Sequence, residues 1–124
     1  MMSRVLGAVF RPEADVPEPL PPQVGVFRNR WVTALGGWLS GMRKPAAAVT
    51  LGDAILIHPD VRLTASLLRH ELAHVRQWKQ RPLTFPIRYV LRHLRHGYEK
   101  NPYEVEARAA ELKNPPTNPA RRPV

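Results

Sequence analysis

The chain has 124 residues, of which 19 are Lys or Arg and 10 are Asp or Glu, so its formal net charge is +9. This length suits one compact domain, and a positive charge of this size favours anionic partners. Because the chain contains no cysteine, disulfide frameworks, thiolate metal sites and cysteine nucleophiles are excluded. Any metal site must therefore use histidine nitrogens and carboxylate oxygens.

Proline-rich stretches lie on both sides of the central part of the chain. Residues 11–23 contain five prolines, and residues 114–124 have a similar composition. We expect a flexible N-terminal arm over 1–23, one domain over 24–113 and a flexible C-terminal tail over 114–124. The first ten residues show no secretory cleavage site, and no apolar run approaches the about 20 residues that a spanning helix needs. We therefore expect a cytoplasmic protein.

The first half of the domain shows two local patterns. Apolar residues recur at spacings of three and four between Phe27 and Met42, which predicts a helix, although two glycines weaken the pattern. The segments AVTL (48–51) and AILI (54–57) flank the pair Gly52-Asp53, which is typical of a two-residue hairpin turn. We therefore expect a helix followed by a β-hairpin.

Three further helices are predicted in the second half. Thr64 is a typical N-cap residue for a helix over 65–80, which ends before a proline. A second helix is expected over 86–97, and Asn101 is a suitable cap for a third over 102–113. This order indicates an α+β fold: a mostly helical, minimal domain with its short hairpin packed on the helix over 65–80.

That helix carries the pattern H-E-x-x-H at His70, Glu71 and His74. A step of four residues places both imidazoles on one helix face, where they can bind one zinc ion. Glu71 then lies beside the metal and can act as the general base that takes a proton from a metal-bound water. The ordinary alternative is a helix with two hydrogen-bonded core histidines and Glu71 buried against an arginine.

A catalytic zinc site usually has a third protein ligand, and the residues alone leave several candidates. His93 and His96 lie on or near the basic face of the helix over 86–97. Glu104 and Glu106 both belong to the last helix, about 160° apart around its axis, so they cannot both face one metal. Glu104 also has an ordinary interpretation, as the capping-box residue of Asn101 or as an ion-pair partner of Arg108.

The sequence resembles the gluzincins, metallopeptidases in which a glutamate on a downstream helix, followed by x-x-Ala, completes the zinc site. Glu104 and Ala107 match that pattern. The sequence resembles more closely a group of small bacterial metallopeptidase domains of unknown function, which join an A-x-T-x-G hairpin, a helix with H-E-x-x-H-x-x-Q and an acidic helix. The matching residues, within a likeness that spans about 24–112, are Ala48, Thr50, Gly52, His70, Glu71, His74, Gln77 and Glu104.

The resemblance implies a zincin-like domain with zinc (Zn2+) on His70, His74 and Glu104, and with Glu71 as the general base. It also implies that the strand over 54–57 is the rim that holds an extended substrate by strand addition. We therefore expect a zinc metallopeptidase, a hydrolase that cleaves a peptide or protein substrate.

The chain departs from its relatives at Arg108, where they usually have an Asp or Asn that supports a ligand histidine. Asp53 or Asp60 could give that support instead. The residue that stabilises the oxyanion is left open among Tyr98, Tyr103 and His96.

The helix over 86–97 supports an alternative function. One face is apolar, and the other carries Arg88, Arg92 and Arg95. The alternative is a non-catalytic metal-binding module that docks on an anionic membrane surface or another acidic partner through this helix. A nucleic acid is less favoured because the chain has no base-reading motif. The sequence leaves the oligomeric state open.

Overall fold

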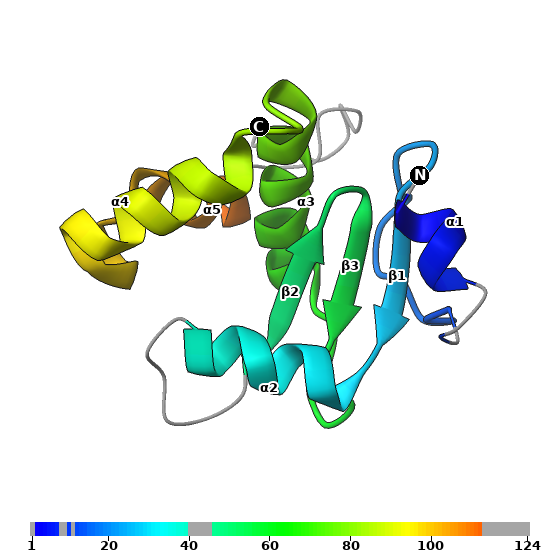
Figure 1. Cartoon of the computed structure of the whole chain (residues 1–124). Helices are drawn as coiled ribbons and strands as arrows, with labels where there is room; N and C mark the ends of the chain where they lie inside the picture. Colours follow the sequence, from blue (N-terminus) through cyan, green and yellow to red (C-terminus); the bar gives the residue numbers. More distant parts are fainter. Residues whose placement is uncertain (1, 8–9, 11, 40–45, 113–124) are drawn as a thin grey trace, which may run out of the picture.

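The computed structural model describes residues 2–7, 10, 12–39 and 46–112. Within them, helices and strands follow one another in the order α1 (Met2–Gly7), β1 (Gly25–Arg28), α2 (Arg30–Leu39), β2 (Ala48–Leu51), β3 (Ala54–Ile57), α3 (Ala65–Gln80), α4 (Phe85–Lys100) and α5 (Pro102–Glu111). Figure 1 shows a small sheet surrounded by helices. The predicted α+β class, mostly helical with a short hairpin, is confirmed.

The three strands form one sheet in the order β1-β3-β2. β2 and β3 pair antiparallel around a turn at Gly52, whose φ of 63° glycine adopts without steric cost, so the predicted hairpin is confirmed. β1 pairs parallel with β3, with Gly25 opposite Ala54. β3 is therefore the central strand, with all four residues buried, and β2 lies at an edge of the sheet.

The helix expected from Phe27 begins later than predicted. Phe27 belongs to β1, and α2 begins at Arg30. Asn29 caps this helix, because its Oδ1 accepts a hydrogen bond from the Val32 N–H at 2.8 Å. The prediction was wrong at this end because the residues of β1 also fit the helical spacing, while their strand pairing is with a distant segment. The other predicted end, Met42, lies outside the described residues.

Helices cover both faces of the sheet. On one face, β1 and β3 pack against α3 through the buried side chains of Val26, Ile55, Ile57, Leu68 and Val75. On the other face, they pack against α1 and α2 through Leu6, Val32, Phe27 and Leu56. Each fully buried aliphatic side chain of this kind contributes about 1.5–3 kcal/mol. This packing holds α3, and with it the H-E-x-x-H pattern, against the hairpin.

The described part of residues 1–23 packs against the domain. It begins with α1, and four of its apolar side chains, Leu6, Phe10, Val16 and Leu20, lie against the two faces of the core. Residues 12–23 form neither helix nor strand apart from a bridge between Pro12 and Phe27, as their prolines require. Apolar residues between the prolines account for the packing. The predicted flexibility of this arm stays a prediction, and the predicted tail over 114–124 lies outside the described residues.

The ends of α3 and α4 follow the predicted signals. The Thr64 Oγ1 accepts a hydrogen bond from the Leu67 N–H at 3.1 Å, which confirms Thr64 as the cap of α3. The regular part of α4 ends at Gly97, whose φ of 78° and ψ of 170° are not helical, and a final turn leads to Lys100.

α5 begins after Asn101, whose Oδ1 accepts a hydrogen bond from the Tyr103 N–H at 3.0 Å. Along its length α5 packs on α3 through three small buried residues, Ala73, Ala107 and Ala110. Small side chains let the two helices approach closely, so residues on their facing sides can meet. In the described part of the chain, no helix has both the length and the apolar character needed to cross a bilayer.

Candidate metal centre

The H-E-x-x-H residues lie on the buried side of α3. His70, Glu71 and His74 are 8%, 5% and 7% exposed. Each of the three offers a ligand atom, and these atoms lie within 4.8 Å of one another. This cluster could therefore hold a metal ion.

Glu104, in the first turn of α5, points at the same histidines. Its Oε1 lies 2.9 Å from the His70 Nε2 and 3.3 Å from the His74 Nε2, and the residue is 3% exposed. Its Oε2 accepts a hydrogen bond from the Tyr89 hydroxyl at 2.5 Å. The packing of α5 on α3 thus brings together the three residues that the sequence predicts as ligands.

The contacts of Glu104 differ from both ordinary interpretations, a capping box with Asn101 and an ion pair with Arg108. In a capping box its carboxylate would accept from the Asn101 N–H, but that N–H donates to the Tyr98 carbonyl oxygen at 3.3 Å. The Arg108 guanidinium donates to the Glu99 carbonyl oxygen.

The other candidate ligands do not belong to the cluster of His70, Glu71 and His74, although His93 lines a cavity that these residues also line. Glu106 is exposed, and its carboxylate accepts a hydrogen bond from the Gln77 Nε2 at 3.2 Å. His96 is exposed. His93 is half-buried and stacks on the Tyr89 ring, with centroids 6.4 Å apart.

The second nitrogen of each α3 histidine is held by an acceptor. The His70 Nδ1 lies 2.8 Å from the Glu111 Oε2, and the Ser66 hydroxyl donates to the other oxygen of Glu111 at 2.9 Å. The His74 Nδ1 lies 2.8 Å from the Gln77 Oε1. Both acceptors favour a proton on Nδ1, so each Nε2 can offer its lone pair to a metal.

Two residues that contact the cluster, Glu111 and Tyr89, were missed in the sequence analysis. Support for a ligand histidine was expected from Asp53 or Asp60, but Asp53 lies at the hairpin turn and Asp60 in the loop before α3. Glu111 follows Glu104 by two helical turns and therefore lies on the same face of α5. This spacing was a usable signal. Glu111 thus contacts the His70 Nδ1 from a position three residues after Arg108.

The charges of the cluster stabilise one another. Burial lowers the pKa of His70, but hydrogen bonds to Glu104 and Glu111 and the charge of Glu71 outweigh it and raise the pKa to about 9. The pKa of His74 is raised for similar reasons. Burial would raise the pKa of Glu104, yet its hydrogen bonds to both histidines hold that pKa well below the usual range. Without a metal, protons on the two imidazoles therefore balance the charge of the Glu104 carboxylate. A divalent cation can replace these protons and bind the same two nitrogens and one oxygen.

For Glu71 the balance is different: burial raises the pKa of this carboxyl, and the nearby histidine charges offset that rise only in part. One carboxylate oxygen lies 3.1 Å from the Thr50 hydroxyl, which donates to it from β2. The Thr50 carbonyl oxygen in turn accepts a hydrogen bond from the Trp78 Nε1–H at 3.1 Å. The edge strand therefore orients the proposed base.

The cluster lies between two cavities. One, of about 300 Å³, is lined mainly by apolar residues of β2 and α4, among them Val49, Phe85, Val90 and Leu94. The other, of about 600 Å³, extends along residues 46–48 toward His58 and Glu111. Five residues line both cavities: Ala46, Ala48, His70, Glu71 and Tyr98. The cluster is thus accessible from two sides.

The structure corrects the expected substrate rim. The strand over 54–57 is β3, which is buried and paired on both sides, so it has no free edge for a further strand. The strand that borders the cavity is β2, whose Ala48, Val49 and Thr50 belong to its lining. The error arose because the sequence shows the hairpin but not the parallel pairing of β1 with β3.

The three residues considered for stabilising the oxyanion lie in different surroundings. Tyr98 lines both cavities, Tyr103 packs edge-on against Phe85 with ring centroids 5.0 Å apart, and His96 is exposed. Burial and the charges of Glu104 and Glu71 raise the pKa of Tyr98, so its hydroxyl remains a donor at neutral pH.

The family model of the eCIS core domain matches residues 42–82, less than half of the chain. The matched segment contains β2, β3 and α3, and thus His70, Glu71 and His74. It ends before α4 and α5, so it does not include Glu104. The match is compatible with a zincin-like domain. No curated protein and no solved structure matches the chain.

Proposed function

We propose that the chain is a zinc-dependent metallopeptidase in which His70, His74 and Glu104 bind the metal and Glu71 is the general base. The main support is that two imidazole Nε2 atoms of α3 meet one carboxylate oxygen of α5. The Glu104 Oε1 lies 2.9 Å from the His70 Nε2 and 3.3 Å from the His74 Nε2. Two nitrogens and one oxygen are the donor set of many catalytic zinc sites, which keep a fourth position open.

A zinc ion bound there would lower the pKa of a water to about 7 and polarise a substrate carbonyl. Glu71 faces both cavities and accepts the proton of the attacking water on its carboxylate. Its raised pKa lets it hold that proton and pass it to the leaving amine. The Thr50 hydroxyl keeps the carboxylate in place during both transfers.

The proposed substrate is a peptide or protein in an extended conformation. Strand addition would use the backbone groups at the edge of β2 other than the Thr50 carbonyl oxygen, which already accepts from Trp78, and the cavity beside the strand accepts an apolar side chain. Tyr98 is the proposed donor to the oxyanion, because among the three residues considered it alone lines the cavities. Location in the cytoplasm stays a prediction.

The test combines metal analysis with cleavage of a peptide library. We expect about one zinc per chain in the wild type, and a Glu71→Gln variant that keeps its zinc but loses cleavage, because the amide cannot accept the proton. Glu99→Gln is the matched control, since Glu99 is exposed on the last turn of α4. Cleavage retained in Glu71→Gln, or a wild type that binds no zinc, would contradict the proposal. A wild type that binds zinc but cleaves nothing would favour the non-catalytic module.

A further inference from the structure

α4 presents an apolar surface that no other described element covers. Ile87, Leu91 and Leu94 are 61%, 59% and 76% exposed, and Leu83, just before the helix, is 87% exposed. The apolar face of an amphipathic helix normally lies on the core. Here the core contact of α4 is made instead by Phe85, which is 4% exposed and packs against Trp78. Among the described residues, nothing therefore covers these aliphatic side chains.

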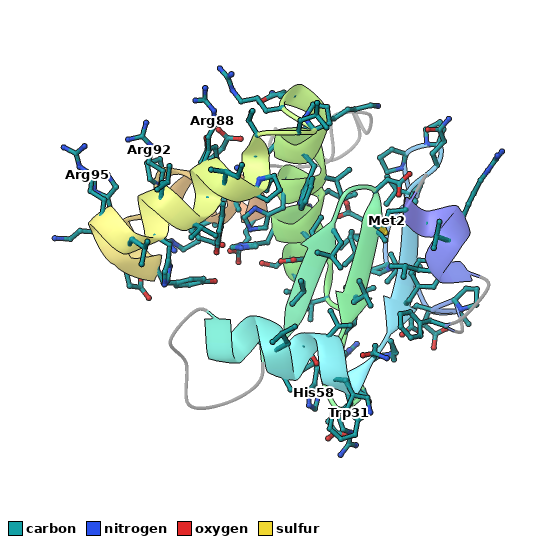
Figure 2. All side chains as sticks on the ribbon, viewed as in Figure 1. Met2, Trp31, His58, Arg88, Arg92 and Arg95 are labelled. Atoms are coloured by element: carbon teal, nitrogen blue, oxygen red, sulfur yellow. The ribbon has the colours of Figure 1, made fainter. Side chains whose placement is uncertain are left out.

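Three arginines border these aliphatic residues. Arg88, Arg92 and Arg95 are exposed, and Figure 2 shows their side chains on one side of α4, directed away from the rest of the molecule. None of their guanidinium groups forms a hydrogen bond or ion pair within the described part of the chain. Residues three or four apart are neighbours on a helix, so Leu91 lies beside Arg88 and Arg95. We call the combined patch the α4 surface; it consists of Leu83, Ile87, Leu91, Leu94, Arg88, Arg92 and Arg95.

We propose that the α4 surface docks on a membrane surface that contains anionic lipids. Unpaired guanidinium groups match lipid phosphate and carboxylate groups, and adjacent aliphatic side chains match the boundary of the acyl region. The net charge of +9 attracts the whole protein to such a surface. The helix would lie in the plane of the interface, with Ile87 and Leu91 inserted and the arginines at the level of the headgroups.

Other partners satisfy only part of this chemistry. A nucleic acid would pair with the arginines but leave the aliphatic side chains in water. A second copy of the same surface would bury the aliphatic side chains but place like charges opposite one another across the symmetry axis. A lipid surface accommodates both sets of side chains at once.

Docking would also bring the metal centre to the membrane. Val90 and Leu94 of α4 line the apolar cavity, as does Tyr89, which bonds to Glu104. The cavity beside the metal centre would therefore lie close to the lipid surface. The docking itself does not depend on the proposed peptidase activity.

Vesicle co-sedimentation of the full chain tests the proposal. We expect binding to vesicles of phosphatidylcholine and phosphatidylserine in equal parts, weaker binding as salt is added, and little binding to phosphatidylcholine alone. Replacing Arg88, Arg92 and Arg95 together by Gln should weaken binding roughly a hundredfold. Replacing Ile87 and Leu91 together by Ser should weaken it by about tenfold or more, because the inserted apolar area is lost.

Two matched controls separate docking from general attraction. The triple change of Arg4, Arg30 and Arg62 to Gln removes the same charge from exposed positions outside α4. The double change of Val5 and Leu35 to Ser removes exposed apolar side chains from α1 and α2. We expect both controls to bind more tightly than the corresponding α4 variants. Equal losses of vesicle affinity in the two triple arginine variants would overturn the proposal. So would an Ile87/Leu91 double variant that binds as tightly as the wild type, or a wild type that does not bind acidic vesicles.

The same measurement on Glu71→Gln keeps this proposal distinct from the proposed function. We expect that variant to bind vesicles as the wild type does, because Glu71 is buried at the metal centre and does not belong to the α4 surface.

Discussion

Glu111 should determine how tightly the metal centre binds zinc, although it is not a ligand. Its Oε2 lies 2.8 Å from the His70 Nδ1, and its side chain is 31% exposed, so Glu111→Ala removes the contact without opening the core. A carboxylate in this position orients the imidazole and makes its other nitrogen a stronger donor. We therefore expect Glu111→Ala to fold normally and to bind zinc less tightly than the wild type.

The expected loss is about 10–100-fold in affinity, or about 1.4–2.7 kcal/mol. A second effect opposes it at neutral pH. In the metal-free protein the same hydrogen bond helps to raise the pKa of His70 to about 9, so zinc must displace a proton. Loss of Glu111 lowers the pKa of His70, so a proton competes less strongly with zinc for this histidine. Above the wild-type pKa of about 9 the opposing effect vanishes, and the full loss should appear.

The assay is zinc competition against a chromophoric chelator, at neutral pH and above the His70 pKa. Glu99→Ala is the control, because it removes the same charge from an exposed position that contacts neither histidine. A Glu111→Ala variant that binds zinc as tightly as Glu99→Ala at both pH values would refute the reasoning. It would mean that the contact between Glu111 and His70 does not support the metal site.

Three further outcomes test the metal centre. Glu104→Gln keeps the shape of the side chain but replaces an anionic donor, so zinc content after dialysis should fall below that of the wild type; equal content would show that Glu104 is not a ligand. Thr50→Val removes a hydrogen bond that lowers the pKa of Glu71, so the acidic limb of the kcat/KM profile should move to higher pH; an unmoved limb would contradict the role of Thr50. In the metal-free protein the raised pKa of His70 stabilises the fold below its ordinary pKa of 6.5, and this contribution, about 3 kcal/mol at most, is lost as the pH rises through about 9. Urea unfolding with a chelator present should show a falling free energy over that range in the wild type and a smaller fall in His70→Gln.

Several features of the fold follow from local patterns alone. The hairpin turn needs only Gly52 between two short apolar segments, and the cap of α3 needs only a hydroxyl at Thr64. The two imidazoles of His70 and His74 share one face because of helix geometry. These features depend on residues within a few positions of one another, so the sequence predicts them well.

The position of Glu104 was predicted from a resemblance, and its supporting contacts could not be read from spacing. Its carboxylate reaches the histidines because α5 packs on α3 through Ala73 and Ala107, and no local pattern specifies that pairing of helices. Tyr89 reaches Glu104 through the packing of a third helix, α4.

By itself, the sequence determined the helix with its two histidines, the hairpin beside it and the excess of positive charge. Only the tertiary structure decided that β3 is central and β2 lies at an edge, that Glu111 contacts the His70 Nδ1, and that no other described element covers the apolar residues of α4. The physical reason is how far apart along the chain the interacting residues lie. Turns, caps and helix faces depend on neighbours in the chain, whereas strand order, burial and contacts between helices depend on how distant segments share one small core.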